Sequence, residues 1–208
     1  MDTTSRATAL ALGIRLEVVT VLWMTAEAIA ALAAAIIARS VLLAAFGFDS
    51  LVELLSGVVL LWRLSAEAKG AVTERVERLE LSTARISAVL LILLCGFVIL
   101  TSAAGLLTGV RAADSALGLA VAAIAVVAMP VLAFAKSRAN RAINSASLRA
   151  DIAETVTCAY MAGVTLAGVA VSMAFGLWWV QYVCALALLV WLVPEAREAL
   201  ESARDNAT

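Results

Sequence analysis

The sequence predicts an all-α polytopic membrane protein with six transmembrane helices and both termini in the cytoplasm. Hydrophobic residues make up 64% of the 208 residues and charged residues only 15%, whereas a soluble domain carries about 25% charged residues. The mean hydropathy is +1.03. Six apolar runs are each long enough, at about 20 residues, to cross a hydrocarbon layer of roughly 30 Å.

The six spans are expected in close succession along the chain. They are placed at 17–38, 41–62, 86–108, 115–135, 148–171 and 173–193. The first two are separated only by Arg39 and Ser40, which predicts a tight turn, and the last two are joined by a similarly short stretch.

The charged residues gather between and after these spans. The segments 63–85 and 136–149 carry most of the charge, and the alternating acids and bases of 67–80 are typical of a solvated or interfacial helix. Pro194 is expected to stop the last span, because a proline lacks the amide hydrogen that a helix needs. We therefore expect a transport domain over 1–194 and a short polar cytoplasmic tail over 195–208, with no further cytoplasmic domain.

The distribution of basic residues predicts the orientation. Of the 15 lysines and arginines, all except Arg39 and Arg111 fall on one side of the predicted spans. Cytoplasmic loops carry the excess of lysine and arginine in membrane proteins. This side, which includes both termini, is therefore expected in the cytoplasm.

Composition also excludes several classes of protein. A net charge of -1 gives no nucleic-acid surface, and the first long apolar run is a full span rather than a cleavable secretory signal. The three cysteines, Cys95, Cys158 and Cys184, lie inside apolar runs and are expected as free thiols. The high alanine content and the compact size favour the inner membrane of a bacterial cell.

Five acidic residues fall at membrane depth. They are Glu27 in the first span, Asp49 and Glu53 in the second, and Asp151 and Glu154 in the fifth. A charge at the bilayer centre costs at least about 2.5–3.5 kcal/mol. No lysine or arginine is expected inside the spans to pair with these acids. We therefore expect protons or a bound cation to neutralise them.

The spacing of these acids predicts a metal site. Asp49 and Glu53 are four residues apart and share one helix face, and Glu154 and Cys158 have the same relation. The second and fifth spans run in opposite directions. At about 1.5 Å per residue, the two pairs overlap in depth. Three carboxylates and one thiol form a ligand set suited to tetrahedral zinc.

Each candidate residue also has a structural interpretation. Cys158 is either a ligand or a small packing residue, and Asp151, close to Arg149, is either an interfacial acid or an accessory proton-coupling group. Glu27 can hold a proton, bond to a neighbouring helix or act as a further ligand. Gly105 and Gly109 form a small-xxx-small pattern that is a candidate dimer contact.

Two stretches carry a resemblance to a known family. The run Ala45-Phe-Gly-Phe-Asp-Ser-Leu-Val-Glu-Leu-Leu-Ser56 resembles the second helix of the cation diffusion facilitators, and Ser147-Leu-Arg-Ala-Asp-Ile-Ala-Glu-Thr-Val-Thr-Cys158 is similar to their fifth. The resemblance implies a six-helix homodimer that exports divalent metals, chiefly zinc, in exchange for protons. It also implies that Asp49, Glu53, Glu154 and Cys158 are the transport site.

Typical members of this family carry a cytoplasmic metal-binding domain after the sixth helix and histidines in a loop, and neither is expected in this sequence, which has no histidine. The sequence departs from the family's usual pattern at two further points. A cysteine, Cys158, stands where the family normally has an aspartate, and Gln181-Tyr182 occupies a place where related sequences tend to show Asp-Pro. The pattern therefore predicts a branch of the family that consists of the transmembrane domain alone.

The predicted function is that of a proton-coupled divalent metal exporter and not that of an enzyme. The transported ion is expected to be zinc, with cadmium, cobalt, manganese and iron as further candidates, and no cofactor is expected to be permanently bound. Two alternatives stay open. One is a proton-coupled exporter of small organic cations, since Trp23 lies one helical turn from Glu27. The other is a non-transporting membrane subunit or metal-sensing scaffold.

Overall fold

The computed structural model describes residues 3–69 and 74–205, and these form six α-helices with no strand among them. The helices are α1 (Thr3–Ala38), α2 (Val41–Ala68), α3 (Glu74–Thr108), α4 (Ala116–Ile143), α5 (Ala146–Phe175) and α6 (Val180–Asp205). Each contains a stretch that is long and apolar enough to cross a membrane. The predicted fold class is therefore confirmed.

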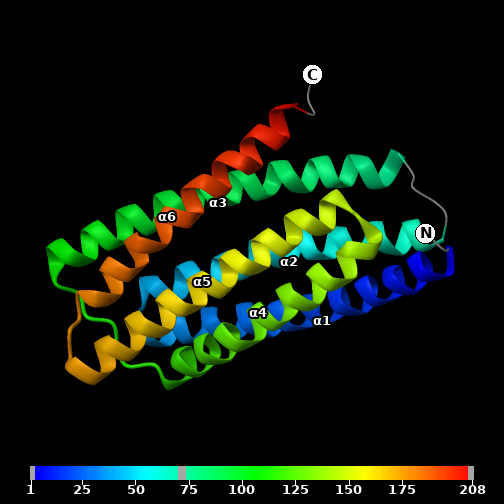
Figure 1. Cartoon of the computed structure of the whole chain (residues 1–208). Coiled ribbons are helices and arrows are strands. Elements are labelled where there is room, and N and C mark those ends of the chain that lie inside the picture. Colours follow the sequence, from blue (N-terminus) through cyan, green and yellow to red (C-terminus); the bar gives the residue numbers. More distant parts are fainter. Residues whose placement is uncertain (1–2, 70–73, 206–208) are drawn as a thin grey trace.

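The six helices run roughly antiparallel in two groups (Figure 1). Helices α1, α2, α4 and α5 pack together, while α3 lies along α6 and joins the rest mainly through α2. The start of α1, the end of α2, the start of α3, the end of α6 and the α4–α5 connection lie at one end, which we call the terminal end. The α1–α2, α3–α4 and α5–α6 connections lie at the opposite end, which we call the loop end.

Serine caps begin three of the helices. The hydroxyl oxygens of Ser40, Ser115 and Ser145 accept hydrogen bonds from amides three residues later, at 3.2, 3.0 and 3.4 Å. A serine in this position satisfies an amide that the first helical turn leaves free. Gly176 ends α5 in the left-handed conformation, with a φ of 65°. Ser40 and Gly176 lie at the two short connections that the sequence predicts.

The helices extend further than the predicted spans. Pro194 lies inside α6, which continues to Asp205, so the expectation that Pro194 stops the helix is wrong. The predicted interfacial helix over 67–80 is not a separate element in the described residues. Its first residues complete α2, its last residues begin α3, and 70–73 lie outside the part of the chain that the structure describes.

Helices α3 and α6 approach each other closely at Gly105. A Cβ atom at Gly105 would overlap the ring of Tyr182, so only glycine leaves room for this side chain. The Tyr182 hydroxyl donates a hydrogen bond of 2.9 Å to the carbonyl oxygen of Val110. Gly105 therefore serves packing within one chain.

Three polar side chains join helices at the loop end. Ser40 at the start of α2 donates to the Gln181 side-chain oxygen at 2.6 Å, and Gln181 on α6 donates to Ser172 of α5 at 3.1 Å. All three residues are buried. This neutral network ties α2, α5 and α6 together where the chain turns.

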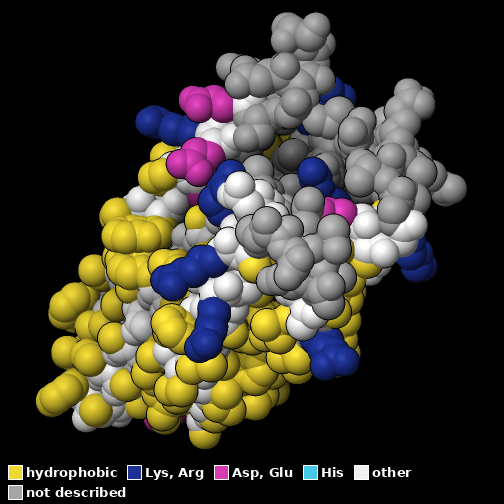
Figure 2. Space-filling model, turned by 45° about the vertical axis from the view of Figure 1, so that its right-hand side comes forward, with side chains coloured by type: hydrophobic (Ala, Val, Ile, Leu, Met, Phe, Trp, Pro, Cys, Tyr) yellow, Lys and Arg dark blue, Asp and Glu magenta, His cyan; other side chains and the backbone are white. Residues whose placement is uncertain are grey.

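The exterior matches a protein that lies in a lipid bilayer. Figure 2 shows a broad hydrophobic surface over the body of the molecule, with basic and acidic side chains gathered toward one end. Large apolar side chains such as Ile36, Leu107 and Phe134 are 79%, 88% and 70% exposed. Hydrocarbon is the medium in which such exposure is favourable.

Candidate metal site

Three predicted ligands meet between α2 and α5. Asp49 and Glu53 lie one turn apart on α2, and Cys158 faces them from α5. One ligand atom from each lies within 4.8 Å of the others. The three residues are buried, at 5%, 6% and 1% exposure. This group is called the α2–α5 cluster below.

The carboxylates of the α2–α5 cluster have no positively charged partner among the described residues. Among the described residues, neither Asp49 nor Glu53 forms an ion pair, and Glu53 Oε1 is buried without a hydrogen-bond partner. A buried acceptor without a partner is costly. Two carboxylates and a thiol offer a divalent cation both hard and soft donors.

Glu154 lies near the cluster without joining its closest group. It is one turn from Cys158 along α5, its Oε2 atom is buried without a hydrogen-bond partner, and its charge interacts with Glu53 and Asp49. No ligand atom of Glu154 falls within the 4.8 Å group. In this conformation the four predicted ligands therefore stand as three together and one alongside.

Glu27 of α1 is held by three contacts. Its Oε2 atom accepts a hydrogen bond from Trp23 Nε1 at 2.6 Å. Its Oε1 atom accepts from Ser50 Oγ at 2.8 Å and lies 3.6 Å from Cys158 Sγ. Glu27 does not belong to the 4.8 Å group. It is therefore in position to orient the thiol of Cys158 from behind.

A basic side chain is present at depth, contrary to the sequence-based expectation. Lys136 of α4 is 1% exposed, and its Nζ atom lies 2.6 Å from Asp151 Oδ2 and 3.1 Å from Glu17 Oε2. Asp151 thus has a resident positive partner. The expectation failed because α4 continues past the predicted end of its span, and Lys136 was assigned to the following loop.

Glu195 of α6 is a further acid that sequence reasoning missed. It follows Pro194 and was assigned to the polar tail, yet its Oε2 atom is buried without a hydrogen-bond partner. Its charge interacts with those of Asp49 and Glu154. The signal that reveals Glu195 is helical continuity through Pro194, which the sequence alone did not indicate.

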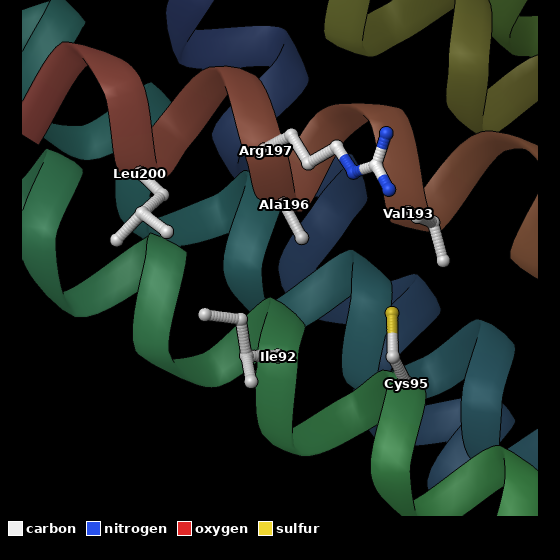
Figure 3. A pocket seen from close by; sticks show the side chains of 6 residues that line it. All are labelled: Ile92, Cys95, Val193, Ala196, Arg197 and Leu200. Carbon is white, nitrogen blue, oxygen red and sulfur yellow. The ribbon is translucent and has the colours of Figure 1, made fainter.

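A pocket of about 170 Å³ between α3 and α6 is distinct from this cluster (Figure 3). It is lined by Ile92, Cys95, Val193, Ala196, Arg197 and Leu200. No acidic side chain lines it, and its one charged residue is an arginine. The pocket therefore has no ligand set for a cation.

Comparison with known proteins decides the family. A family model of the cation efflux transmembrane domain matches residues 18–206. The chain belongs to the cation efflux family. A comparison with curated proteins finds no significant match. Cation efflux proteins, the cation diffusion facilitators, are membrane transporters and not enzymes, so this chain is a multi-pass cation transporter. Their transported substrates are divalent metal cations.

Proposed function

We propose that this cation efflux domain exports zinc in exchange for protons, and that Asp49, Glu53, Glu154 and Cys158 bind the zinc ion. The observation that carries the proposal is the meeting of two carboxylates and a thiol within 4.8 Å, inside helices that are apolar enough to span a membrane. Tetrahedral zinc takes four ligands of this kind. Glu154, one turn from Cys158, is the fourth.

The choice of zinc rests on the ligand types. Thiolate sulfur favours zinc and other soft or borderline ions, while magnesium and calcium prefer all-oxygen sites. Cadmium, cobalt, manganese and iron are secondary candidates. In this proposal the metal is the transported substrate, and the protein needs no permanently bound cofactor.

Proton exchange follows from the chemistry of these ligands. A low dielectric favours the neutral form of a carboxyl group or thiol. Metal binding requires the deprotonated ligands and so releases protons. A site that alternates between protons and metal neutralises the buried acids in both states. Asp49 and Glu53, which lack ion-pair partners in the described residues, are suited to this exchange.

The remaining assignments complete the proposal. The excess of lysine and arginine at the terminal end favours a cytoplasmic location for both termini. We propose a homodimer in the inner membrane of a bacterium. Residues 1–194 then form the transport domain and 195–208 the cytoplasmic tail, although α6 continues into this tail.

Flux measurements on purified protein in liposomes test the proposal. Zinc entry and proton movement in the opposite direction should both be seen with indicators trapped inside the vesicles. Asp49→Asn and Glu154→Gln should each reduce zinc flux at least about tenfold, since each removes a charged ligand. Asp114→Asn, at an exposed loop position, is the matched control. Undiminished zinc flux in both cluster variants would refute the site, and zinc flux without proton movement would refute the coupling.

A further inference from the structure

Lys136 lies between two further buried acids, and the three residues come from three different helices. Its Nζ atom lies 2.6 Å from Asp151 Oδ2 on α5 and 3.1 Å from Glu17 Oε2 on α1. Lys136, Asp151 and Glu17 are 1%, 4% and 0% exposed. We call these three residues the Lys136 triad. A positive charge is thus already bound between two carboxyl groups in the interior of the bundle.

The single ammonium group leaves part of this acidic pair unsatisfied. Glu17 Oε1 and Asp151 Oδ1 are both buried without a hydrogen-bond partner. A lysine ammonium has three donors and one positive charge, whereas two ionised carboxyl groups carry two negative charges. A divalent cation matches that charge and takes oxygen ligands from carboxylates.

The triad lies beside the α2–α5 cluster, on the side of the terminal end. On α5, Asp151, Glu154 and Cys158 are separated by three and four residues, so they follow one helix face. On α2, Gly57 lies one turn beyond Glu53, and a Cβ atom at Gly57 would be 3.0 Å from Glu17 Oε1. The two groups of acids are therefore about one to two helical turns apart, at about 5.4 Å per turn.

We propose that Glu17 and Asp151 form a second site for a divalent cation, which Lys136 fills as a tethered cation in this conformation. The metal binds there when the ammonium group withdraws. From this site the ion can pass to Glu154 and Glu53 of the α2–α5 cluster. Lys136 competes with the metal for the two carboxylates. This inference rests on the proposed function, because it assumes that the neighbouring α2–α5 cluster binds the same ion.

Counting bound zinc in a lysine variant tests the proposal. Lys136→Met removes the ammonium group and keeps a linear apolar side chain of similar length. Zinc bound at saturation, measured by equilibrium dialysis and elemental analysis, should rise from about one ion per chain in the wild type to about two in this variant, because both sites are then free. Lys69→Met, the same change at an exposed lysine, is the matched control and should bind about one ion.

The extra ion should depend on the two acids of the triad. In Lys136→Met/Glu17→Gln/Asp151→Asn, binding should return to about one ion per chain. A zinc count in Lys136→Met no higher than that of the wild type would overturn the proposal, as would an extra ion that survives in the triple variant. Zinc should also raise the melting temperature of Lys136→Met by more than it raises that of the wild type.

The accumulation of Lys136→Met in cells grown with and without added zinc is a further test. If Lys136→Met accumulates only when cells grow with added zinc, the metal replaces the ammonium group as proposed. Lys136→Gln, which retains a hydrogen-bond donor, is the second variant for the same count. Failure of both variants to accumulate with and without zinc would overturn the proposal, because the Lys136 triad would then be a structural ion pair that a metal cannot replace.

The Asp49→Asn background separates this inference from the proposed function. If both hold, Asp49→Asn should bind almost no zinc, and Asp49→Asn/Lys136→Met should bind about one ion. Zinc binding to the wild type but not to the double variant would leave the proposed function standing and reject the second site. Zinc binding to Lys136→Met alone, with none to the wild type, would reject the cluster and retain the second site.

Discussion

Replacement of Glu27 should weaken zinc binding without abolishing it. Glu27 Oε1 lies 3.6 Å from Cys158 Sγ, but Glu27 is outside the group of ligand atoms within 4.8 Å of one another. Glu27 thus contacts a proposed metal ligand without being one itself, a position that we call the outer-shell role. Loss of such a partner typically costs 10–100-fold in metal affinity, which is about 1.4–2.8 kcal/mol at about 1.4 kcal/mol per tenfold.

The two variants of Glu27 should fall at different ends of this range. Glu27→Gln retains one side-chain oxygen that can accept from Cys158 or Ser50, but its amide group then meets the Trp23 N–H donor to donor, so we expect a loss of about tenfold. Glu27→Ala removes all three contacts and should cost close to about one-hundredfold. Glu198→Gln, at an exposed site, is the control.

Competition with a fluorescent zinc chelator, on protein in detergent micelles, measures these affinities. Equal zinc affinity in Glu27→Ala and the wild type would show that Glu27 does not support Cys158. A loss as large as that of Cys158→Ala would show instead that Glu27 is itself a ligand. Either result would refute the outer-shell role.

Two further changes test the ligand set and the packing. Cys158→Asp replaces the only sulfur ligand, so the ratio of zinc to magnesium affinity should fall by at least about tenfold in competition binding; an unchanged ratio would exclude the thiol as a ligand. Gly105→Ala forces a methyl group into the ring of Tyr182 and should destabilise the protein by about 1–3 kcal/mol. The control is Gly96→Ala, where no atom outside the local helix lies within 4 Å of the added Cβ, and equal melting temperatures for the two would contradict the packing.

The sequence was sufficient for the features that depend on a single helix. Hydropathy identified all six helices, because a span needs a long apolar run whatever its neighbours are. The four-residue spacing of Asp49 and Glu53 placed them on one face of α2. Their approach to Cys158 depends on how α2 and α5 pack. For this packing the sequence indicated only that the two pairs of residues lie at similar depths in the membrane.

The residues that were missed lie near the predicted ends of spans. Glu17 and Lys136 fall at such boundaries, where hydropathy does not tell whether a side chain points to water or into the bundle. The helices continue beyond the hydrophobic runs, and each of these side chains turns inward to an opposite charge. Glu195 was missed because one proline was treated as the end of a helix that runs to Asp205.

The contact between Trp23 and Glu27 gives this transporter an optical readout of its own. The indole N–H lies 2.6 Å from a carboxylate oxygen whose partner oxygen is next to the thiol of Cys158. Indole fluorescence responds to charge beside the ring, so a change at Cys158 that moves Glu27 alters the emission of Trp23. A variant that retains Trp23 alone among the five tryptophans would then report substrate loading in real time, with no attached dye.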